Sequence, residues 1–430
     1  MPVNSAIKSV HCRRIWDSRG KPTVEVEVIL EDGSMGRGIA PAGASRGAAE
    51  ASEIRDGGKT LGGFDVSLAL NNINSKISPA MIGMDTINQR EIDSKLVELD
   101  PSPTKDKLGG NATIAVSLAT LNAAAAYHRL PLWKYIAGES EVSLPLPEIQ
   151  IFGGGAHAGR RVDIQDFMIV PLSAETFDQA LEITAEIYLT AGQLMSSKGK
   201  LAGVADEGGW WPNFQTNEEA LETLVKSIEI AGFKPGEEIG ISLDVAGSEL
   251  WENGTYKLSL ENKELSSEDL TELFGRWIET YPIVSIEDPF AEDDHDGMKM
   301  FTKAYGDRIQ IIGDDYLVTN AQKITNSASQ GICNAALIKV NQAGTVSEAL
   351  NALEAAKKAG WGTIISARSG ETEDVTLTHL AVGFDAGQLK VGSFSRSERM
   401  AKWNEGLRIA EQMGTAVSYI GRKALSSSNG

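Results

Sequence analysis

Hydrophobic and polar positions alternate in the first part of the chain. Val24, Val26 and Val28 are separated by glutamates, and the turn-forming sequence Glu-Asp-Gly follows at 31–33. Alternation with a period of two is typical of a strand that is buried on one face. The segment from Ile7 to Ile39 is therefore predicted to form an antiparallel meander.

A helical pattern follows this meander. Residues 108–129 are rich in alanine and leucine, which favour helices, and the pattern ends just before Pro131. A run of strands followed by a run of helices is typical of an α+β domain. We expect a small N-terminal α+β cap domain over residues 1–135.

Beyond Leu144, short apolar strands alternate with amphipathic helices. Repeated βα units indicate a parallel sheet, and this many units favour a closed (β/α)8 barrel over residues 136–430, with an open doubly wound sheet as the alternative. The predicted strands are 166–170, 239–244, 284–287, 309–314, 336–340, 362–366 and 388–390. The predicted helices include 176–196, 218–231, 267–280, 346–359 and 396–412.

Net charge and hydropathy limit the kinds of partner that the protein can bind and the places in the cell where it is expected. The formal net charge is −19, which repels nucleic acids and anionic membranes. No apolar run approaches the roughly 18 residues that span a bilayer, and the first ten residues lack the pattern of a signal peptide. We therefore expect a cytoplasmic protein that binds neither nucleic acid nor membrane. Its two cysteines, Cys12 and Cys333, are too few for a disulfide framework.

Three acidic residues and one lysine fall at the ends of successive predicted strands. These are Asp244, Glu287, Asp314 and Lys339. In a barrel the carboxyl ends of the strands converge on one mouth, so these side chains are expected to meet in one cleft. Crowded carboxylates repel one another unless a cation lies between them, and all-oxygen ligands suit Mg²⁺ or Mn²⁺. The pattern predicts a divalent metal site.

Lys339 lies in an apolar strand, where a lysine needs a specific reason to be present. A nearby divalent cation and burial both lower the pKa of an ammonium group, which makes a neutral base available. Such a base can remove a proton α to a metal-bound carboxylate, because the metal stabilises the resulting enolate. Salt bridging or a snorkelling side chain is the structural alternative.

Other residues at the predicted mouth suit acid–base chemistry and anion binding. Glu207, in an irregular Gly-rich loop, is a candidate acid, and His157 follows three glycines. Arg368 follows a strand and Lys390 ends the last one, and both are suited to phosphate. The glycine-bounded segment 43–47 is expected to be a flap that closes over the mouth.

These motifs together resemble the enolase family along the whole chain. The matching stretches are Asp17-Ser18-Arg19-Gly20, Gly109-Gly110-Asn111-Ala112, Asp206-Glu207-Gly208-Gly209, Ser285-Ile286-Glu287-Asp288-Pro289-Phe290, Gly313-Asp314-Asp315, Leu337-Ile338-Lys339-Val340-Asn341-Gln342 and Arg368-Ser369-Gly370-Glu371-Thr372-Glu373-Asp374.

The resemblance implies an enolase-type barrel and a role for each matching residue. It implies Mg²⁺ at one tight site, a second Mg²⁺ arriving with substrate, a 2-phosphoglycerate or phosphoenolpyruvate type of substrate, and a homodimer or higher homo-oligomer. The implied metal ligands are Asp244, Glu287 and Asp314; the implied catalytic residues are Lys339, Glu207, Asp166 and His157; and the implied substrate-binding residues are Arg368, Ser369, Lys390, Gln165, Ser45 and Arg46.

The sequence departs from the family pattern at several of these positions. Asp166 stands where the family has glutamate, Ala367 where it has histidine, and Arg46 where it has threonine. The pair Trp210-Trp211 replaces an aromatic-alanine pair, and Arg160-Arg161 adds two cations near His157. The change at Ala367 opens volume, while the arginines are expected to bring positive charge to the rim.

We therefore expect a specialised enolase paralogue. It would keep the enolate-stabilising machinery and admit a further anionic phosphonate group, as in a carboxyphosphonoenolpyruvate synthase of phosphonate biosynthesis. One alternative is the ordinary enolase, or phosphopyruvate hydratase, of glycolysis. A second alternative is a non-catalytic enolase-like binding protein.

Overall fold

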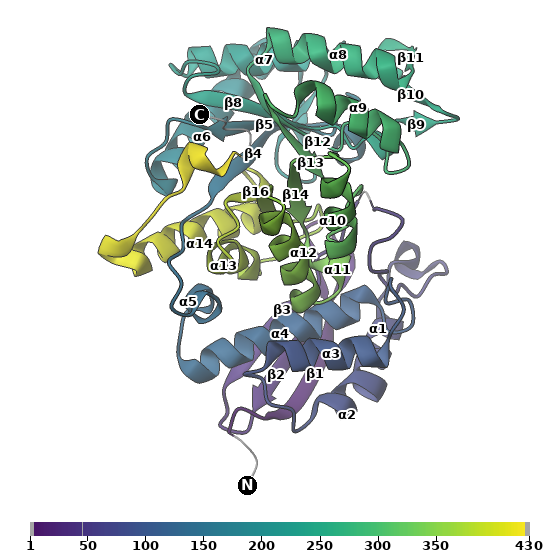
Figure 1. Cartoon of the computed structure of the whole chain (residues 1–430), viewed down its shortest axis with the longest axis vertical. Helices are drawn as coiled ribbons and strands as arrows, with labels where there is room; N and C mark the ends of the chain where they lie inside the picture. Colours follow the sequence, from purple (N-terminus) through teal and green to yellow (C-terminus); the bar gives the residue numbers. More distant parts are fainter. Residues whose placement is uncertain (1–3, 45, 426–430) are drawn as a thin grey trace.

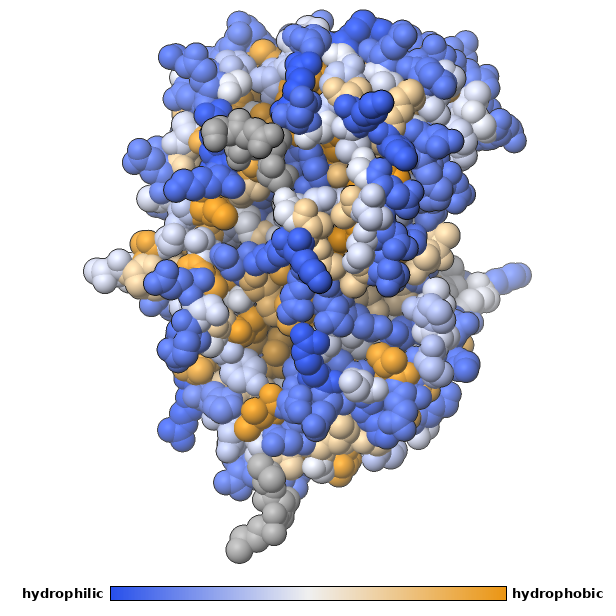
Figure 2. All heavy atoms as spheres, in the orientation of Figure 1, coloured by the Kyte–Doolittle hydropathy of each residue, from blue (hydrophilic) through white to orange (hydrophobic). Residues whose placement is uncertain are grey.

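A computed structural model describes residues 4–44 and 46–425 of the chain (Figure 1). The N-terminal strands and helices form a layer at one end of the molecule, and the barrel with its surrounding helices forms the rest. Among the described residues there is no helix long and apolar enough to cross a membrane. Hydrophilic side chains predominate on the face shown in Figure 2.

The N-terminal sheet is the predicted antiparallel meander. Its three strands are β1 (Ile7–Trp16), β2 (Pro22–Leu30) and β3 (Met35–Ile39), paired in the order β1-β2-β3. Val24, Val26 and Val28 are fully buried, as their alternation with polar residues predicts. This inward face packs against helices.

Helix α4 (Gly110–His128) covers the inner face of this sheet. Its small side chains let it approach β3 closely: a Cβ added at Gly36 would lie 2.1 Å from the backbone nitrogen of Ala123. Only glycine fits at that strand position, so the close packing of β3 on α4 depends on Gly36. The other N-terminal helices are α1 (Ser67–Asn72), α2 (Ser78–Met81), α3 (Gln89–Leu99) and α5 (Leu132–Ala137).

A barrel follows, closed by the pairing of its first and last strands. In spatial order the strands are β4 (Leu146–Gly153), β5 (Asp166–Pro171), β8 (Ile239–Asp244), β12 (Ile283–Glu287), β13 (Gln310–Gly313), β14 (Ala335–Ile338), β15 (Gly362–Ser366) and β16 (Gln388–Ser393), and β16 pairs with β4. The open-sheet alternative is therefore wrong. The hairpin β6 (Leu201–Val204) and β7 (Trp210–Pro212) joins the sheet beside β4, while β9 (Trp251–Glu252), β10 (Thr255–Leu258) and β11 (Lys263–Leu265) form a separate small sheet.

The expectation of an all-parallel barrel is wrong at one strand. Strand β5 runs antiparallel to both β4 and β8. The connection between β4 and β5, residues 154–165, contains only a short turn, η3 (Gly155–Ala158). A parallel neighbour needs a crossover, usually a helix, whereas an antiparallel neighbour does not. The reversal places Asp166, the first residue of β5, at the same end of the barrel as His157, which lies within this connection.

The barrel helices are α6 (Phe177–Ser197), α7 (Asn217–Ile230), α8 (Ser267–Thr280), α9 (His295–Tyr305), α10 (Ala321–Ser329), α11 (Val340–Ala343), α12 (Val346–Lys358), α13 (Thr376–Gly383) and α14 (Ser397–Met413). The five predicted barrel helices correspond to α6, α7, α8, α12 and α14 to within a few residues, whereas α9, α10, α11 and α13 were not predicted. Several barrel helices begin at a Ser or Thr whose hydroxyl accepts from a backbone N–H of the first turn, as at Thr176 and Thr345.

The N-terminal layer meets the barrel at its mouth. Ala42 pairs with Gly370 as an isolated β-bridge, and the backbone N–H of Ala51 donates to the carbonyl of Gln342 at 2.8 Å. These contacts join the segment around residues 41–51 to the loops that follow β14 and β15. The cap therefore lies beside the residues that are candidates for chemistry.

Candidate active site

The four residues at the ends of predicted strands converge on the mouth of the barrel. Asp244 and Glu287 are the last residues of β8 and β12 and are directly paired in register. Asp314 and Lys339 follow the last residues of β13 and β14. A cavity of about 310 Å³ at this mouth is lined by His157, Gln165, Asp166, Glu207, Asp244, Lys339, Ser366, Ala367, Arg368, Ser369 and Lys390, together with two neighbouring residues of β16.

Two lysines form ion pairs with the three predicted metal ligands. The Lys390 ammonium lies 2.9 Å from Asp244 Oδ2 and 2.7 Å from Glu287 Oε2, and Lys339 forms an ion pair with Asp314. Burial, joined by the charge of Asp244, holds the pKa of Glu287 well above its usual range. Burial lowers the pKa of Lys339, but the charges of Asp314, Glu287 and Asp315 together outweigh it and raise that pKa.

The three carboxylates fit Mg²⁺ in chemistry and position. They offer only oxygen ligands, they lie on successive strands, and the buried Glu287 Oε1 has no hydrogen-bond partner. Two other groups of three His, Asp or Glu residues have ligand atoms within 4.8 Å of one another, whereas this set does not. Lys390 and Lys339 form ion pairs with these three carboxylates, so a bound metal would compete with the two ammonium groups for the same oxygens.

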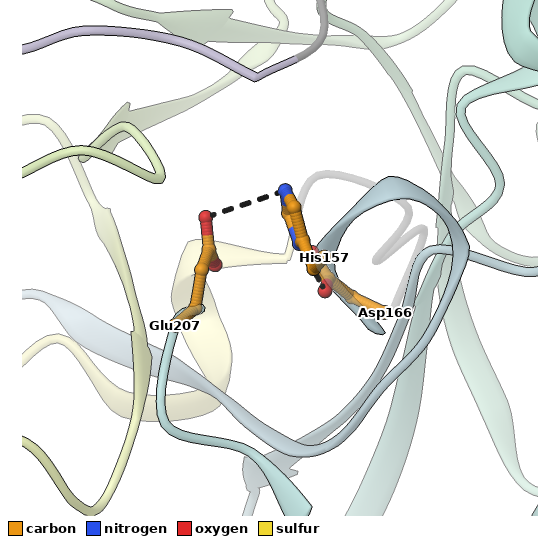
Figure 3. Close-up of side chains that lie close together, drawn as sticks. All are labelled: His157, Asp166 and Glu207. Atoms are coloured by element: carbon orange, nitrogen blue, oxygen red, sulfur yellow. Dashed lines mark hydrogen bonds and ion pairs between the residues drawn. The ribbon is translucent and has the colours of Figure 1, made fainter. Parts of the chain in front are cut away.

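His157 lies between two carboxylates (Figure 3). Its Nδ1 is 3.3 Å from Asp166 Oδ1, and its Nε2 is 3.8 Å from Glu207 Oε1. Burial lowers the pKa of His157, but the charges of Glu207 and Asp166 outweigh it and raise the pKa to about 9. His157, Asp166 and Glu207 form one of the two groups whose ligand atoms lie within 4.8 Å of one another. The geometry of this group does not suit a single metal ion, because the two nitrogens of the imidazole ring face different carboxylates. It suits a protonated imidazole that holds both.

The second compact group, formed by Asp288, Asp314 and Asp315, shapes the turn after β13. The Asp288 carboxylate accepts the backbone N–H groups of Asp314 at 2.8 Å and Asp315 at 2.7 Å. Burial and the charge of Asp314 raise the pKa of Asp315 to about 7. Asp288 therefore fixes the backbone from which Asp314 projects.

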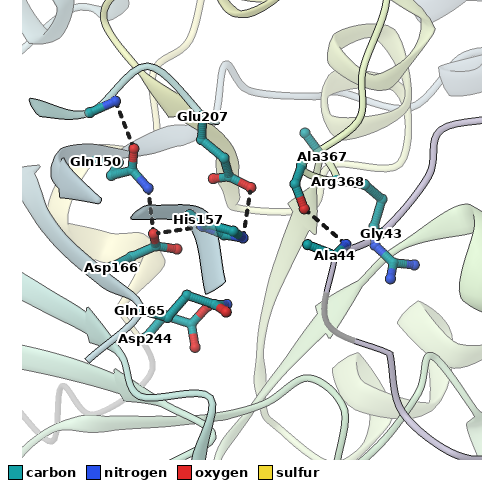
Figure 4. A network of polar contacts seen from close by, with 12 residues as sticks. Gly43, Ala44, Gln150, His157, Gln165, Asp166, Glu207, Asp244, Ala367 and Arg368 are labelled. Atoms are coloured by element: carbon teal, nitrogen blue, oxygen red, sulfur yellow. Dashed lines mark hydrogen bonds and ion pairs between the residues drawn. The ribbon is translucent and has the colours of Figure 1, made fainter. Parts of the chain in front are cut away.

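Arg368 and Ser369 form the side of the cavity that is suited to an anion. Arg368 is buried and donates to Glu50 Oε2 at 3.2 Å and to Asn341 Oδ1 at 3.1 Å. Ser369 Oγ accepts the backbone N–H of Ala44 at 3.0 Å, which joins the predicted flap to the barrel (Figure 4). From α14, the buried Arg399 donates to the carbonyls of residues 368, 369 and 391 and so supports this segment.

The arginines that were expected to charge the rim have other partners. Arg46 forms an ion pair with Glu50 at 2.9 Å, and Arg160 pairs with Glu249. Arg161 lies over the ring of Trp211, 5.4 Å from its centroid. The structure therefore does not place these cations at the substrate cavity. The prediction for Ser45 lies outside the described residues.

Several site residues had no sequence signal. Gln165, which was predicted, donates to Asp244 Oδ2 at 3.1 Å, but Gln342, which donates to Asp314 Oδ1 at 2.9 Å, was missed. Glu50 and Gln150 were also missed. An uncharged amide or a glutamate four residues after an arginine has no distinctive spacing, and only the fold reveals its partners.

The fold and the site define a class of protein: a barrel enzyme with acid–base groups and predicted divalent-metal ligands at the strand ends, under an N-terminal α+β cap.

Comparison with known proteins gives the family. A family model described as "Enolase, N-terminal domain" matches residues 7–136, and one described as "Enolase, C-terminal TIM barrel domain" matches residues 141–428. "Enolase 1" of Desulfitobacterium hafniense (strain Y51) is 47% identical over 416 residues, which cover 96% of this chain and 95% of that protein. The chain belongs to the enolase family. It is a Mg²⁺-dependent lyase of the enolase superfamily.

Proposed function

We propose that the chain is a phosphopyruvate hydratase, which converts 2-phosphoglycerate to phosphoenolpyruvate and water. The observation that carries this proposal is that one cavity holds both Lys339, paired with a predicted metal ligand, and Glu207, paired with His157. A base and an acid in one cavity suit removal of a carbon-bound proton and departure of a hydroxyl group. The full-length identity to a protein named enolase supports the same reaction.

Asp244, Glu287 and Asp314 would hold Mg²⁺, and Lys339 would act as the base. When bound, Mg²⁺ supplies positive charge that stabilises the enolate form of the substrate carboxylate. With Asp314 bound to a cation, the pKa of Lys339 would fall, and its amine would be available as a base. Lys339 then takes the proton from C2 of the substrate.

Glu207 would donate a proton to the leaving hydroxyl. The electron pair left at C2 forms the C2–C3 double bond as the C3–O bond breaks, and the hydroxyl leaves as water. The His157 imidazolium and Asp166 hold Glu207 and the leaving oxygen in place. Arg368 and Ser369 would bind the phosphate, for which a guanidinium fork is suited.

The test is to follow phosphoenolpyruvate formation from 2-phosphoglycerate at saturating Mg²⁺. The unmodified chain should turn over, and Lys339→Met should lose at least about 10³-fold of kcat, as expected when a general base is removed. Lys303→Met, which changes an exposed lysine, is the control. No turnover by the unmodified chain would contradict the proposal.

A specialised paralogue that admits an additional phosphonate group is the second candidate. Ala367 favours it, since its methyl group leaves open space beside Arg368 and Ser369. The comparisons favour the ordinary reaction and give no support for phosphonate biosynthesis. No observation favours a non-catalytic protein, because the base, the acid and the three carboxylates are all present.

The pair of substitutions Ala367→His and Asp166→Glu separates the two candidates. If only this double variant dehydrates 2-phosphoglycerate, while the unmodified chain binds phosphonoacetate together with Mg²⁺ in calorimetry, the specialised paralogue is supported. Full turnover by the unmodified chain supports the ordinary hydratase. The substrate class is the same in both cases.

We further propose that the protein is a cytoplasmic homodimer with domains at residues 1–135 and 136–430. The break falls within α5, at the end of the first matched region (7–136) and before the second begins at residue 141.

Trp16, at the end of β1, is half exposed and offers an apolar side chain suited to a partner. Light scattering that gives twice the chain mass would support the dimer, and the chain mass itself would contradict it.

A further inference from the structure

Gln150 is a buried amide at the centre of the acid–base group. It lies on β4 with none of its surface exposed. Its Oε1 accepts the backbone N–H of Gly209 at 2.8 Å, and its Nε2 donates to Asp166 Oδ1 (Figure 4). One side chain therefore joins the strand that carries Asp166 to the loop that carries Glu207.

The local sequence accommodates this link. A Cβ at position 209 would lie 2.3 Å from Gln150 Oε1, so the contact requires glycine there. The carbonyl of Gln150 in turn accepts the hydroxyl of Ser393 on β16, which anchors the backbone. Because both ends of the amide have partners, its burial leaves no polar atom of this side chain unsatisfied.

Asp166 depends on this contact for its orientation. Its Oδ1 receives both Gln150 and His157, while its buried Oδ2 has no hydrogen-bond partner and lies 3.5 Å from the Lys390 ammonium. The side chain is one methylene shorter than the glutamate of the family pattern. Without Gln150, the negative charge would be drawn towards Lys390 and away from the imidazole.

We propose that Gln150 is a positioning residue, which holds the Asp166 carboxylate against His157 and fixes the Glu207 loop at Gly209. The proposal rests on the proposed elimination for its kinetic consequence but not for the link itself. Displacement of a catalytic group by about 1 Å costs on the order of 100-fold in rate. Removal of the amide should therefore lower kcat and leave substrate binding almost unchanged.

The link is tested first without turnover. The protein is labelled with 5-fluorotryptophan, and the ¹⁹F resonances of Trp210 and Trp211, next to Gly209, are assigned by Trp→Phe changes. Gln150→Met should shift both resonances because the acceptor for Gly209 is lost, whereas Gln150→Glu, which keeps an acceptor oxygen, should shift them less. Gln388→Met removes an equally buried barrel amide and is the control. Resonances unmoved in Gln150→Met would overturn the link.

Kinetics then test the connection to Asp166. With 2-phosphoglycerate and Mg²⁺, Gln150→Met and Gln150→Glu should each lower kcat on the order of 100-fold with KM changed less than about threefold. In an Asp166→Ala background, Gln150→Met should cause little further loss, because the two residues act as a unit. Independent, multiplicative losses, or an equal loss in Gln388→Met, would overturn the positioning role.

The two tests separate failure of the inference from failure of the proposed function. If the unmodified chain does not dehydrate 2-phosphoglycerate, the proposed reaction fails while the ¹⁹F result still decides whether Gln150 holds the loop. If the unmodified chain is active and Gln150→Met retains its kcat, the positioning role fails alone.

Discussion

Lys390 supplies a buried positive charge to the carboxylates of Asp244 and Glu287. A single ammonium group contacts both of them, and all three side chains are buried. Buried charges are stable only when they are paired, so this lysine and Mg²⁺ compete for the same oxygens.

Substitution of Lys390 should therefore destabilise the protein mainly when Mg²⁺ is absent. Lys390→Met leaves two buried carboxylates without their cation, which should lower the free energy of unfolding by about 3–5 kcal/mol in the presence of a chelator. With millimolar Mg²⁺ the difference should shrink. Urea unfolding with Lys303→Met as the control measures both. An equal loss with and without Mg²⁺ would contradict the competition.

The imidazole of His157 should be protonated at neutral pH. Its pKa of about 9 lies above its ordinary value because Glu207 and Asp166 outweigh the effect of burial. A pKa that is higher in the folded state gives stability that is fully present below pH 6.5 and is lost as the pH rises through about 9. The free energy of unfolding lost in His157→Gln, roughly 1–3 kcal/mol at pH 6, should therefore diminish between these values. A constant difference from pH 6 to 9.5, measured by urea unfolding, would count against a protonated imidazole.

Buried hydrogen bonds join helices of the cap to helix α12 of the barrel, close in sequence to Lys339. Asp93 on α3 accepts the hydroxyl of Ser117 on α4 at 2.6 Å and the backbone N–H of Ser347, in the first turn of α12, at 2.8 Å. An anion at a helix N-terminus accepts hydrogen bonds from the unpaired N–H groups of the first turn and interacts favourably with the positive end of the helix dipole. Helix α12 follows α11, which begins directly after Lys339.

Asp93→Ala should therefore loosen this junction. Loss of a buried acceptor leaves its donors unsatisfied, and the free energy of unfolding should fall by about 1–3 kcal/mol. Asp293→Ala, which removes an exposed carboxylate, should change it by less than about 0.5 kcal/mol. Hydrogen exchange at Ser347 should rise in Asp93→Ala. Unchanged protection there would contradict the proposed role.

The sequence pattern predicted the ends of four barrel strands well, but it did not predict β4, the first strand of the barrel. Asp244, Glu287, Asp314 and Lys339 end apolar strands, so periodicity located them. In β4, by contrast, Pro147, Glu148 and Gln150 interrupt the apolar pattern, although each is buried in the barrel. Their partners come from β5, β12 and the 205–209 loop, which no local pattern reveals. The direction of β5 was missed for the same reason, because it depends on a connection rather than on the strand.

The molecule as a whole carries a strong negative charge and yet is expected to bind an anion. Its net charge is −19, so the attraction must come from the barrel mouth, where Lys339, Lys390 and Arg368 lie. The sequence identified these cations by their position at strand ends. It did not identify Glu50, which lies in the cap and pairs with Arg368 across the junction, because only the docking of the cap on the barrel brings the two together.

The role of Lys339 as the base at a magnesium site can be tested by following the hydrogen on C2 of 2-phosphoglycerate in deuterium oxide by proton NMR. With Mg²⁺ present, the unmodified chain should replace this hydrogen with deuterium or release it during dehydration, and Lys339→Met or a chelator should abolish both. Retention of the C2 hydrogen with the unmodified chain and Mg²⁺, or its loss at an unchanged rate in Lys339→Met, would contradict Lys339 as the base at a magnesium site.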